Sequence, residues 1–314
     1  MRIAMACSGR LGASLMEPLL RSPHQVVAML QNGRQYHGLQ RKLMPMLAGT
    51  LSSKTTPTGM ARSNGIPIIW IDKMTEVELA PLRALEPDVL LVGGFSIILK
   101  KPLLTLPKIG CVNTHSSLLP RRRGPNPFHW IIRDNDTETG VTFHVIAEGI
   151  DTGDIIRQYP YPVSPTDTLM GIYKTSCEIA GEHVLEVMDL VEKEGLHGTP
   201  QDESAASYEK KPTGEDVTIR WDDSAVNIER LMRASVPVIW PRFYYRGRPI
   251  YLSKVKAENV ATDAEPGTIL EVRPRVRIAT GDGVLRVLYA YQGWPLPFLW
   301  PMPWNRPAKG EKVS

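Results

Sequence analysis

The sequence predicts a doubly wound α/β domain with a mostly parallel β-sheet, followed by a small β-barrel. Up to residue 194, short apolar runs typical of buried strands alternate with segments of helical periodicity. Several of these runs end at Gly or at a polar side chain, and doubly wound sheets bind ligands at such strand ends. Beyond residue 214 the pattern changes to short strand-like runs separated by turn dipeptides, which is typical of a barrel.

The chain begins with the strand–turn–helix–strand order of a doubly wound sheet. Residues 2–6 fit a buried strand, a Gly-containing turn at 8–12 leads into a helical pattern, and residues 26–30 fit a second strand. Gly9 and Gly12 lack the further glycine of a dinucleotide-binding fingerprint, so they favour a tight turn over a nucleotide site.

A long polar stretch then interrupts the alternation. Residues 31–65 are basic and show no clear periodicity, and a connection of this length within a domain is usually functional or disordered. The α/β pattern resumes afterwards. Strands are expected at 66–71, 88–92, 110–113, 141–146 and 155–161, and helices at 76–85, 100–106 and 168–193.

A polar segment at 195–214, which contains Gly, Pro and Ser, predicts a domain linker. We therefore place one domain at 1–204 and a second at 205–314. The Trp- and Pro-rich tail at 293–307 is expected to be irregular. The second domain is expected to contain a helix at 224–232 and strands at 242–245, 250–255, 268–272, 275–279 and 283–290.

The composition is that of a soluble globular protein, with 42% hydrophobic and 22% charged residues. No apolar run is long enough to span a membrane, and the 3 cysteines are far apart, so we expect a cytoplasmic protein without disulfides or metal. The net charge is +4, and the basic residues are concentrated in 31–65 and in the C-terminal region. Such regions can bind a polyanion such as tRNA, or they can be ordinary solvated surface.

The stretch 111–154 carries the chemistry. Asn113 and His115 follow an apolar run, and Asp151 lies in a Gly-bounded loop after another strand-like run. An amide, an imidazole and a carboxylate that meet at strand ends suit acyl transfer to a nitrogen, because that reaction needs oxyanion donors and a proton acceptor. The same three residue types also occur as a capping Asn, a structural His and a loop carboxylate.

The sequence NTHSSLLPRRRGP, followed by ETGVT and EGIDTGD, resembles the formyltransferases that use 10-formyltetrahydrofolate. The resemblance implies the Rossmann-like formyltransferase fold with an OB-like C-terminal barrel. It also implies that Asn113, His115 and Asp151 are catalytic and that 10-formyltetrahydrofolate is the formyl donor. The folate contacts that it implies are Gly93, Gly94, Phe95, Ser96, Ile97, Ile98, Ile146, Glu148, Gly149 and Ile150.

Segments outside this core are similar to methionyl-tRNA formyltransferases, among them LRALEPDVLLVGGFSIIL and TIRWDDSAVNIERLMRA. Arg41 and Lys42 resemble part of the tRNA-contacting loop of those enzymes. The sequence departs from their pattern at 31–40, at 235–241 and in the tail. Methionyl-tRNA is therefore the first candidate acceptor. An amino sugar or a hydroxylated amino-acid side chain is the second.

Two further classes of function stay open at this stage, namely a hydrolase that releases formate from the same folate and a non-catalytic folate or RNA binder. Other polar residues carry alternatives as well. His129 is expected to pack or cap, and His144 either lines the acceptor cleft or is structural. Arg121, Arg122 and Arg123 form either a solvated loop or a phosphate contact.

Overall fold

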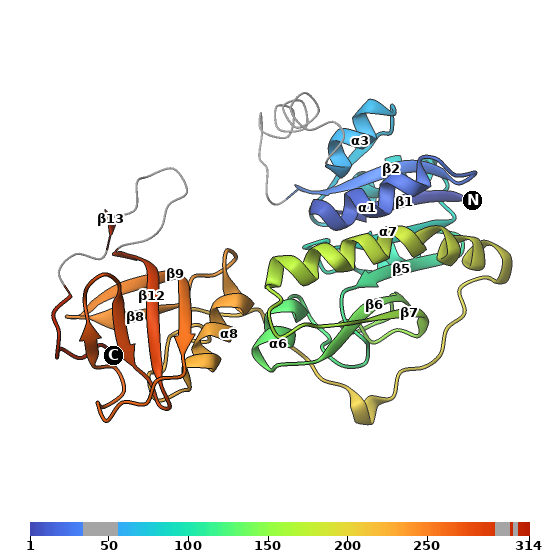
Figure 1. Cartoon of the computed structure of the whole chain (residues 1–314). Helices are drawn as coiled ribbons and strands as arrows, with labels where there is room; N and C mark the ends of the chain where they lie inside the picture. The colour runs from blue at the N-terminus through green and yellow to red at the C-terminus, as the bar shows by residue number, and fades with distance from the viewer. Residues whose placement is uncertain (34–55, 293–301, 304–306) are drawn as a thin grey trace. The chain divides into compact units, whose positions relative to one another are not determined.

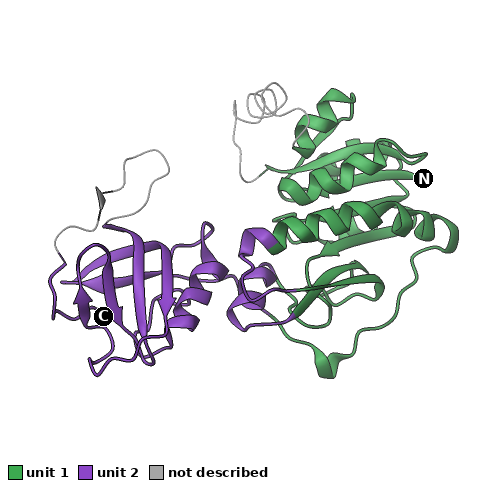
Figure 2. Ribbon diagram, viewed as in Figure 1, with its two compact units in different colours: residues 1–124, 138–162, 172–208 green, residues 125–137, 163–171, 209–314 purple. Residues whose placement is uncertain are grey.

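The computed structural model describes residues 1–33, 56–292, 302–303 and 307–314 (Figure 1). The chain forms two compact units, shown in different colours in Figure 2. The first contains residues 1–124, 138–162 and 172–208, and the second contains residues 125–137, 163–171 and 209–314. The domain boundary that we place after residue 204 stays a prediction. Among the described residues, no helix combines the length and the apolarity that crossing a membrane requires.

A 7-stranded sheet forms the centre of the first unit, with strand order β3-β2-β1-β4-β5-β6-β7. The strands from β3 to β5 pair in parallel, whereas β6 and β7 pair antiparallel, so the mostly parallel sheet is confirmed. The strands are β1 (Arg2–Cys7), β2 (Gln25–Asn32), β3 (Ile68–Ile71), β4 (Val89–Gly93), β5 (Gly110–His115), β6 (Glu138–Val145) and β7 (Ile155–Pro162).

Helices cover both faces of this sheet, as strand alternation requires. Ile3 and Met5 of β1 belong to the hydrophobic cluster that contains residues of α1 and α7, whereas Ala4 and Ala6 belong to the cluster that contains residues of α4. The α-helices among the described residues are α1 (Gly9–Leu19), α3 (Pro57–Ser63), α4 (Glu76–Ala84), α5 (Lys101–Leu104), α6 (Pro127–Arg133), α7 (Leu169–Glu194) and α8 (Ala225–Ser235).

Helix α3 corrects the expectation that 31–65 lacks periodic structure. Thr56 caps the helix by accepting a hydrogen bond from the Gly59 N–H, and Pro57 occupies the first turn. Met60 and Ala61 are buried in the core beside α1. A helix this short shows no clear period in the sequence, and its tertiary contacts stabilise it.

The second unit contains a 6-stranded antiparallel sheet with order β10-β11-β12-β9-β8 and with β13 paired to β12. Backbone hydrogen bonds join residues 310–314 to Ile269 at one edge of the sheet and to Tyr244 at the other. The expected small C-terminal barrel is thus confirmed as a curled antiparallel sheet. Its strands are β8 (Arg242–Tyr245), β9 (Arg248–Glu258), β10 (Ile269–Glu271), β11 (Val276–Ala279), β12 (Val284–Gln292) and β13 (Met302–Pro303).

Candidate active site

The end of β5 carries the first two residues of the predicted trio. Asn113 and His115 alternate with Thr114, so both side chains lie on the same face of the sheet. Strand β5 lies between β4 and β6, and Asn113 is directly opposite His144 of β6. The amide and the imidazole are therefore held by a three-strand frame.

Asp151 reaches the same place from the loop between β6 and β7. Its Oδ1 accepts a hydrogen bond from Asn113 Nδ2 at 3.3 Å, and its Oδ2 lies 3.5 Å from His115 Nδ1. Its Oδ2 also accepts the Gly124 N–H at 2.9 Å. The structure thus brings together the three residues that the sequence proposes as catalytic. Their catalytic roles stay a prediction.

The backbone of the loop at 148–154 is strained in a way that only short polar residues and Gly tolerate. Asp151 has φ +55°, which is uncommon for a residue with a Cβ. Gly149 has φ +122°, in the region that favours glycine. Gly153 lies so close to β6 that an added Cβ would be 1.8 Å from the Val145 carbonyl oxygen. The sharp turn that presents the carboxylate therefore depends on its two glycines.

Asp151 and His115 differ in their charge state at neutral pH. Burial raises the pKa of Asp151, but His115, His144 and the Gly124 N–H together outweigh burial and lower this pKa to about 2. Burial lowers the pKa of His115, and the opposing effect of Asp151 is smaller. At neutral pH the site therefore holds an ionised carboxylate beside a neutral imidazole.

The hydrogen bonds fix the tautomers of both histidines in the cluster. His115 Nε2 faces the Arg122 carbonyl at 2.9 Å and so must donate, which leaves a lone pair on Nδ1 toward Asp151. His144 Nδ1 likewise donates to the Val145 carbonyl at 2.8 Å, and His144 Nε2 accepts from Asn113 Nδ2 at 3.0 Å. Asn113 Nδ2 therefore donates one hydrogen to His144 and the other to Asp151.

His144 is a member of the site to which the sequence assigned no definite role. Its Nε2 lies 3.5 Å from Asp151 Oδ1, and its side chain is 2% exposed. The sequence left His144 open between a structural role and a place in the acceptor cleft. Its position in the register opposite Asn113 was the signal that could have found it.

The segments proposed to bind folate flank β5. Gly93 is the last residue of β4 and residues 94–98 follow it, and residues 146–150 follow β6. Phe95, Ile97 and Ile146 pack in or against one hydrophobic cluster, on the same face of the sheet. Ile98 and Ile150 are exposed apolar side chains, at 76% and 42%. The remaining predicted contacts lie in these two segments and comprise Gly93, Gly94, Ser96, Glu148 and Gly149.

A cavity of about 350 Å³ lies beside the loop that carries Asp151. Ile150 and Thr152, the two neighbours of Asp151, form part of its wall. Arg123 and Tyr208 are further lining residues, and Tyr208 is 55% exposed. Ala206 and Ser207 complete the lining.

The other candidate residues that the structure describes are placed as residues that support the fold. His129 is fully buried, and its Nδ1 donates to the Ala234 carbonyl at 3.1 Å, as expected of a packing residue. Arg123 is buried and paired with Glu203 at 2.7 Å, so it is no solvated loop residue. The basic residues Arg41 and Lys42, and most of the tail at 293–307, lie outside the described residues.

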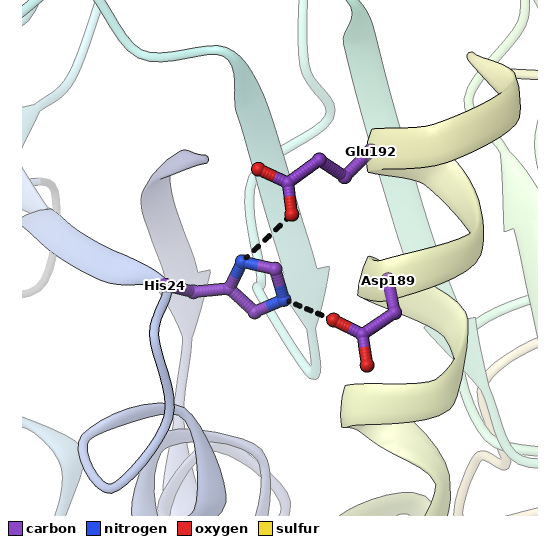
Figure 3. A group of neighbouring side chains, drawn as sticks. All are labelled: His24, Asp189 and Glu192. Carbon is purple, nitrogen blue, oxygen red and sulfur yellow. Dashed lines mark hydrogen bonds and ion pairs between the residues drawn. The ribbon is translucent and has the colours of Figure 1, made fainter.

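A second polar cluster lies where β2 begins, at the end of the strands opposite to Asn113 (Figure 3). His24 Nε2 contacts Asp189 Oδ1 at 3.0 Å, and His24 Nδ1 lies 3.7 Å from Glu192 Oε2. In the part of the chain that the structure describes, these three side chains are the group whose spacing could hold a metal ion. Both ring nitrogens already face a carboxylate of α7. We interpret the group as a structural contact that joins α7 to the start of β2.

Two family models match the chain. One, described as formyl transferase, matches residues 1–188, and the other, described as formyl transferase, C-terminal domain, matches residues 211–292. The first model covers the part of the chain that forms the mostly parallel sheet, and the second covers most of the part that forms the antiparallel sheet.

Solved structures with a similar fold are formyltransferases and HypX. WlaRD, a sugar 3N-formyl transferase in the presence of dTDP and 5-N-formyl-THF, is 19% identical over 94% of this chain and 99% of that chain, with TM-score 0.65. The N-formyltransferase from Helicobacter canadensis, in complex with folinic acid and dTDP-3-aminofucose, is 19% identical over 92% of this chain and 99% of that chain, with TM-score 0.64.

HypX from Aquifex aeolicus, in complex with tetrahydrofolic acid, is 20% identical over 94% of this chain, with TM-score 0.61. The chain spans 44% of the length of HypX. At these identities the likeness is one of fold. The first family model, however, covers more than half of the chain. The chain therefore belongs to the formyl transferase family.

Proposed function

We propose that this chain moves a formyl group from 10-formyltetrahydrofolate to the primary amine of a small molecule. The observation that carries the proposal is the meeting of Asn113, His115 and Asp151 at the end of β5, where the Asp151 carboxylate lies within 3.5 Å of Asn113 Nδ2 and of His115 Nδ1. Membership in the formyl transferase family supports formyl transfer. The folates present in the structures of WlaRD and HypX support the donor.

The folate is a substrate that supplies the formyl carbon and N10 as the leaving group. The exposed side chains of Ile98 and Ile150, which follow the strands on either side of β5, suit the planar apolar face of a pterin. These residues bind and orient the donor, so that its formyl group lies toward Asn113.

The chemistry requires an oxyanion donor and a proton acceptor. The neutral amine attacks the formyl carbon and forms the new C–N bond, and Asn113 Nδ2 donates a hydrogen bond to the developing oxyanion. To do so, this amide gives up its bond to His144 or to Asp151. His144 keeps its bond to the Val145 carbonyl in either case.

His115 is placed to move the proton. An imidazole N–H can in principle donate to the oxyanion, but the His115 Nε2–H is engaged by the Arg122 carbonyl. Its Nδ1 lone pair can accept the proton that the attacking amine loses, and Asp151 at 3.5 Å stabilises the resulting imidazolium. His115 then returns the proton to N10 as the bond between the formyl carbon and N10 breaks. The products are a formamide and tetrahydrofolate.

The cavity next to Asp151 favours a small acceptor. Its volume of about 350 Å³ is in the range of small-molecule sites. Tyr208 and Ile150 offer apolar surface, whereas Thr152 and Ser207 offer hydroxyl groups. Such a lining suits an amino sugar, and two similar structures are described as sugar or aminosugar-bound N-formyltransferases.

Methionyl-tRNA, the first candidate acceptor from the sequence, becomes the second candidate here. It is kept because of the sequence resemblance and because basic residues are in excess in the C-terminal region. Exposed basic residues of the described second unit include Arg248, Lys254 and Lys256 on β9. Such residues bind phosphates without regard to the chemistry of the amine.

Ionic strength separates the two acceptors. A small amine predicts a KM that changes by less than about threefold between about 50 and about 200 mM salt, whereas tRNA binding through several phosphates weakens by ~10³-fold or more. The measurement is KM for an amino-sugar panel and for methionyl-tRNA, with formylated products identified by mass. A KM that rises steeply with salt, and that is raised further by neutralising Arg41 and Lys42, would establish the tRNA. Formate released without any acceptor would instead indicate a hydrolase.

The pH dependence of the rate should show that the amine reacts in its neutral form and that Asp151 stays ionised. Because the pKa of Asp151 is about 2, its carboxylate stays charged throughout the working range. As the pH falls, kcat/KM should decrease first with protonation of the acceptor amine. A further decrease should follow only below about pH 6.5, where His115 takes up a proton before the amine can supply one. The second decrease should be missing in His115→Ala and should move to lower pH in Asp151→Asn, because the carboxylate raises the pKa of His115. A second decrease at an unchanged pH in Asp151→Asn would contradict this coupling.

A further inference from the structure

The loop that presents Asp151 is covered by a short segment that follows α7, residues 199–208, which we call the strap. At its start, Thr199 exchanges two backbone hydrogen bonds with Ile155 of β7, both at 2.8 Å. At its end, the Ser207 carbonyl accepts the Arg123 N–H at 2.8 Å. The strap is thus fastened to the sheet on one side and to the loop after β5 on the other.

Gln201 connects the strap to the catalytic loop. Its Nε2 donates to the Asp151 carbonyl at 2.8 Å and to the Gly153 carbonyl at 2.7 Å. These two carbonyl groups belong to the turn in which Asp151 has φ +55°. One side-chain amide therefore satisfies two backbone acceptors of a strained turn, which stabilises the turn in the geometry that it has.

Arg123 fixes the orientation of this amide. Its Nε and Nη2 donate to Gln201 Oε1 at 3.1 and 2.8 Å, so the oxygen faces donors only and the nitrogen faces acceptors only. A flipped amide would point its oxygen at two carbonyls and its nitrogen at a guanidinium. Arg123 has 8% of its side chain exposed and is held in turn by Glu203, at 2.9 and 2.7 Å.

We propose that Gln201 is a positioning residue for Asp151, acting through the backbone of the catalytic loop and oriented by Arg123. Asn113 and the Gly124 N–H hold the carboxylate end of Asp151, whereas Gln201 holds its backbone end. Without Gln201 the residue can relax to a negative φ, which moves the carboxylate away from His115. The inference rests on the proposed function, in which the carboxylate acts on His115.

The same strap also lines the cavity through Ala206, Ser207 and Tyr208. An acceptor bound in the cavity would therefore contact the segment that positions the catalytic carboxylate. Contacts to the acceptor and alignment of Asp151 thus depend on one short stretch of chain.

Two substitutions test the role of Gln201. Gln201→Met keeps the length of the side chain and removes both N–H donors. Gln201→Glu keeps an oxygen that accepts from Arg123, but it places a second oxygen, which cannot donate, against the Asp151 and Gly153 carbonyls. We expect both to lower kcat by ~10–100-fold, the range for displacing a catalytic group by about 1 Å, with KM for the acceptor changed by less than about threefold.

The matched control is Gln158→Met. Gln158 Nε2 also donates two hydrogen bonds within the first unit, to the Leu119 carbonyl at 2.8 Å and to Thr142 Oγ1 at 3.0 Å, but it does not contact Asp151. A comparable loss of stability with kcat near the wild-type value is expected for this variant. An equal loss of kcat in the control would mean that any lost glutamine bond has this effect, which overturns the proposal.

A double-mutant cycle with Asp151→Asn distinguishes positioning from general support of the fold. If Gln201 acts through the carboxylate, Gln201→Met should lower kcat by less than about twofold in the Asp151→Asn background. The same factor in both backgrounds would show that Gln201 acts elsewhere and would overturn the proposal.

Amide hydrogen exchange of peptides that cover 148–154 gives a readout that needs no activity. Exchange in this loop should become faster in Gln201→Met and stay unchanged in Gln158→Met. If the wild-type protein formylates no amine, the proposed function fails, and the exchange result alone decides whether Gln201 holds the loop. Unchanged exchange in Gln201→Met would overturn the inference in either case.

Discussion

Asp151→Asn should lower kcat for formyl transfer by at least ~100-fold, the usual effect of removing an electrostatic or acid–base partner in the transition state. The substitution is nearly isosteric, and an Asn oxygen can still accept the Gly124 N–H. It removes the negative charge, which lies 3.5 Å from His115 Nδ1 and stabilises the imidazolium in the proposed mechanism. Steady-state rates with a saturating donor, read as formylated product by mass, measure the effect.

Asp154→Asn is the matched control, because Asp154 lies in the same loop and its side chain is exposed. It undergoes the same change of charge, and its backbone carbonyl still accepts the Val145 N–H. We expect this variant to keep kcat within about threefold of wild type, as for a surface substitution away from the site. Turnover near the wild-type value in Asp151→Asn would exclude the carboxylate from catalysis and would remove the basis of the mechanism.

The fold could be predicted because short stretches of the sequence indicate its strands and helices. The apolar runs at 2–6 and 88–92 are long enough to indicate buried strands, and the end of β4 at Gly93 follows directly from them. Asn113 and His115 could be placed at an edge of the sheet for the same reason. Asp151 is expected near them on the premise that these strands end at one edge of a parallel sheet. Strand β6 instead runs antiparallel to β5 and ends opposite Val112, and it is the loop at 148–154 that returns Asp151 to Asn113 and His115.

The rest of the site depends on contacts between residues that are distant in the sequence. His144 joins the cluster only through the register of β6 on β5, and a shift by one residue would turn it to the other face. Gln201 lies in a polar stretch that looks like any linker, and its partners Arg123 and Asp151 are far away along the chain. Helix α3 and the cavity wall at Tyr208 were missed for the same reason, since tertiary packing determines both.

The close approach of Gly153 to β6 leads to the second large effect. Gly153 has no positive φ, so its lack of a side chain matters for space and not for backbone freedom. An added Cβ would be 1.8 Å from the Val145 carbonyl oxygen and 2.7 Å from the Val145 carbonyl carbon. Both neighbours are backbone atoms of a paired strand, which cannot rotate away as a flexible side chain would. The loop must therefore move instead, by about 1 Å or more.

Gly153→Ala should consequently lower kcat by ~100-fold and the free energy of unfolding by about 1–3 kcal/mol, because the moving segment carries Asp151. Circular dichroism and urea unfolding separate the two effects, since a folded variant with low kcat shows displacement of the loop and not loss of the fold. Gly171→Ala is the control, because its nearest neighbour is the flexible Thr168 Oγ1 at 3.3 Å and Ala favours a helix. Wild-type kcat in Gly153→Ala would mean that β6 yields to the new methyl group, and that the position of Asp151 does not depend on this contact.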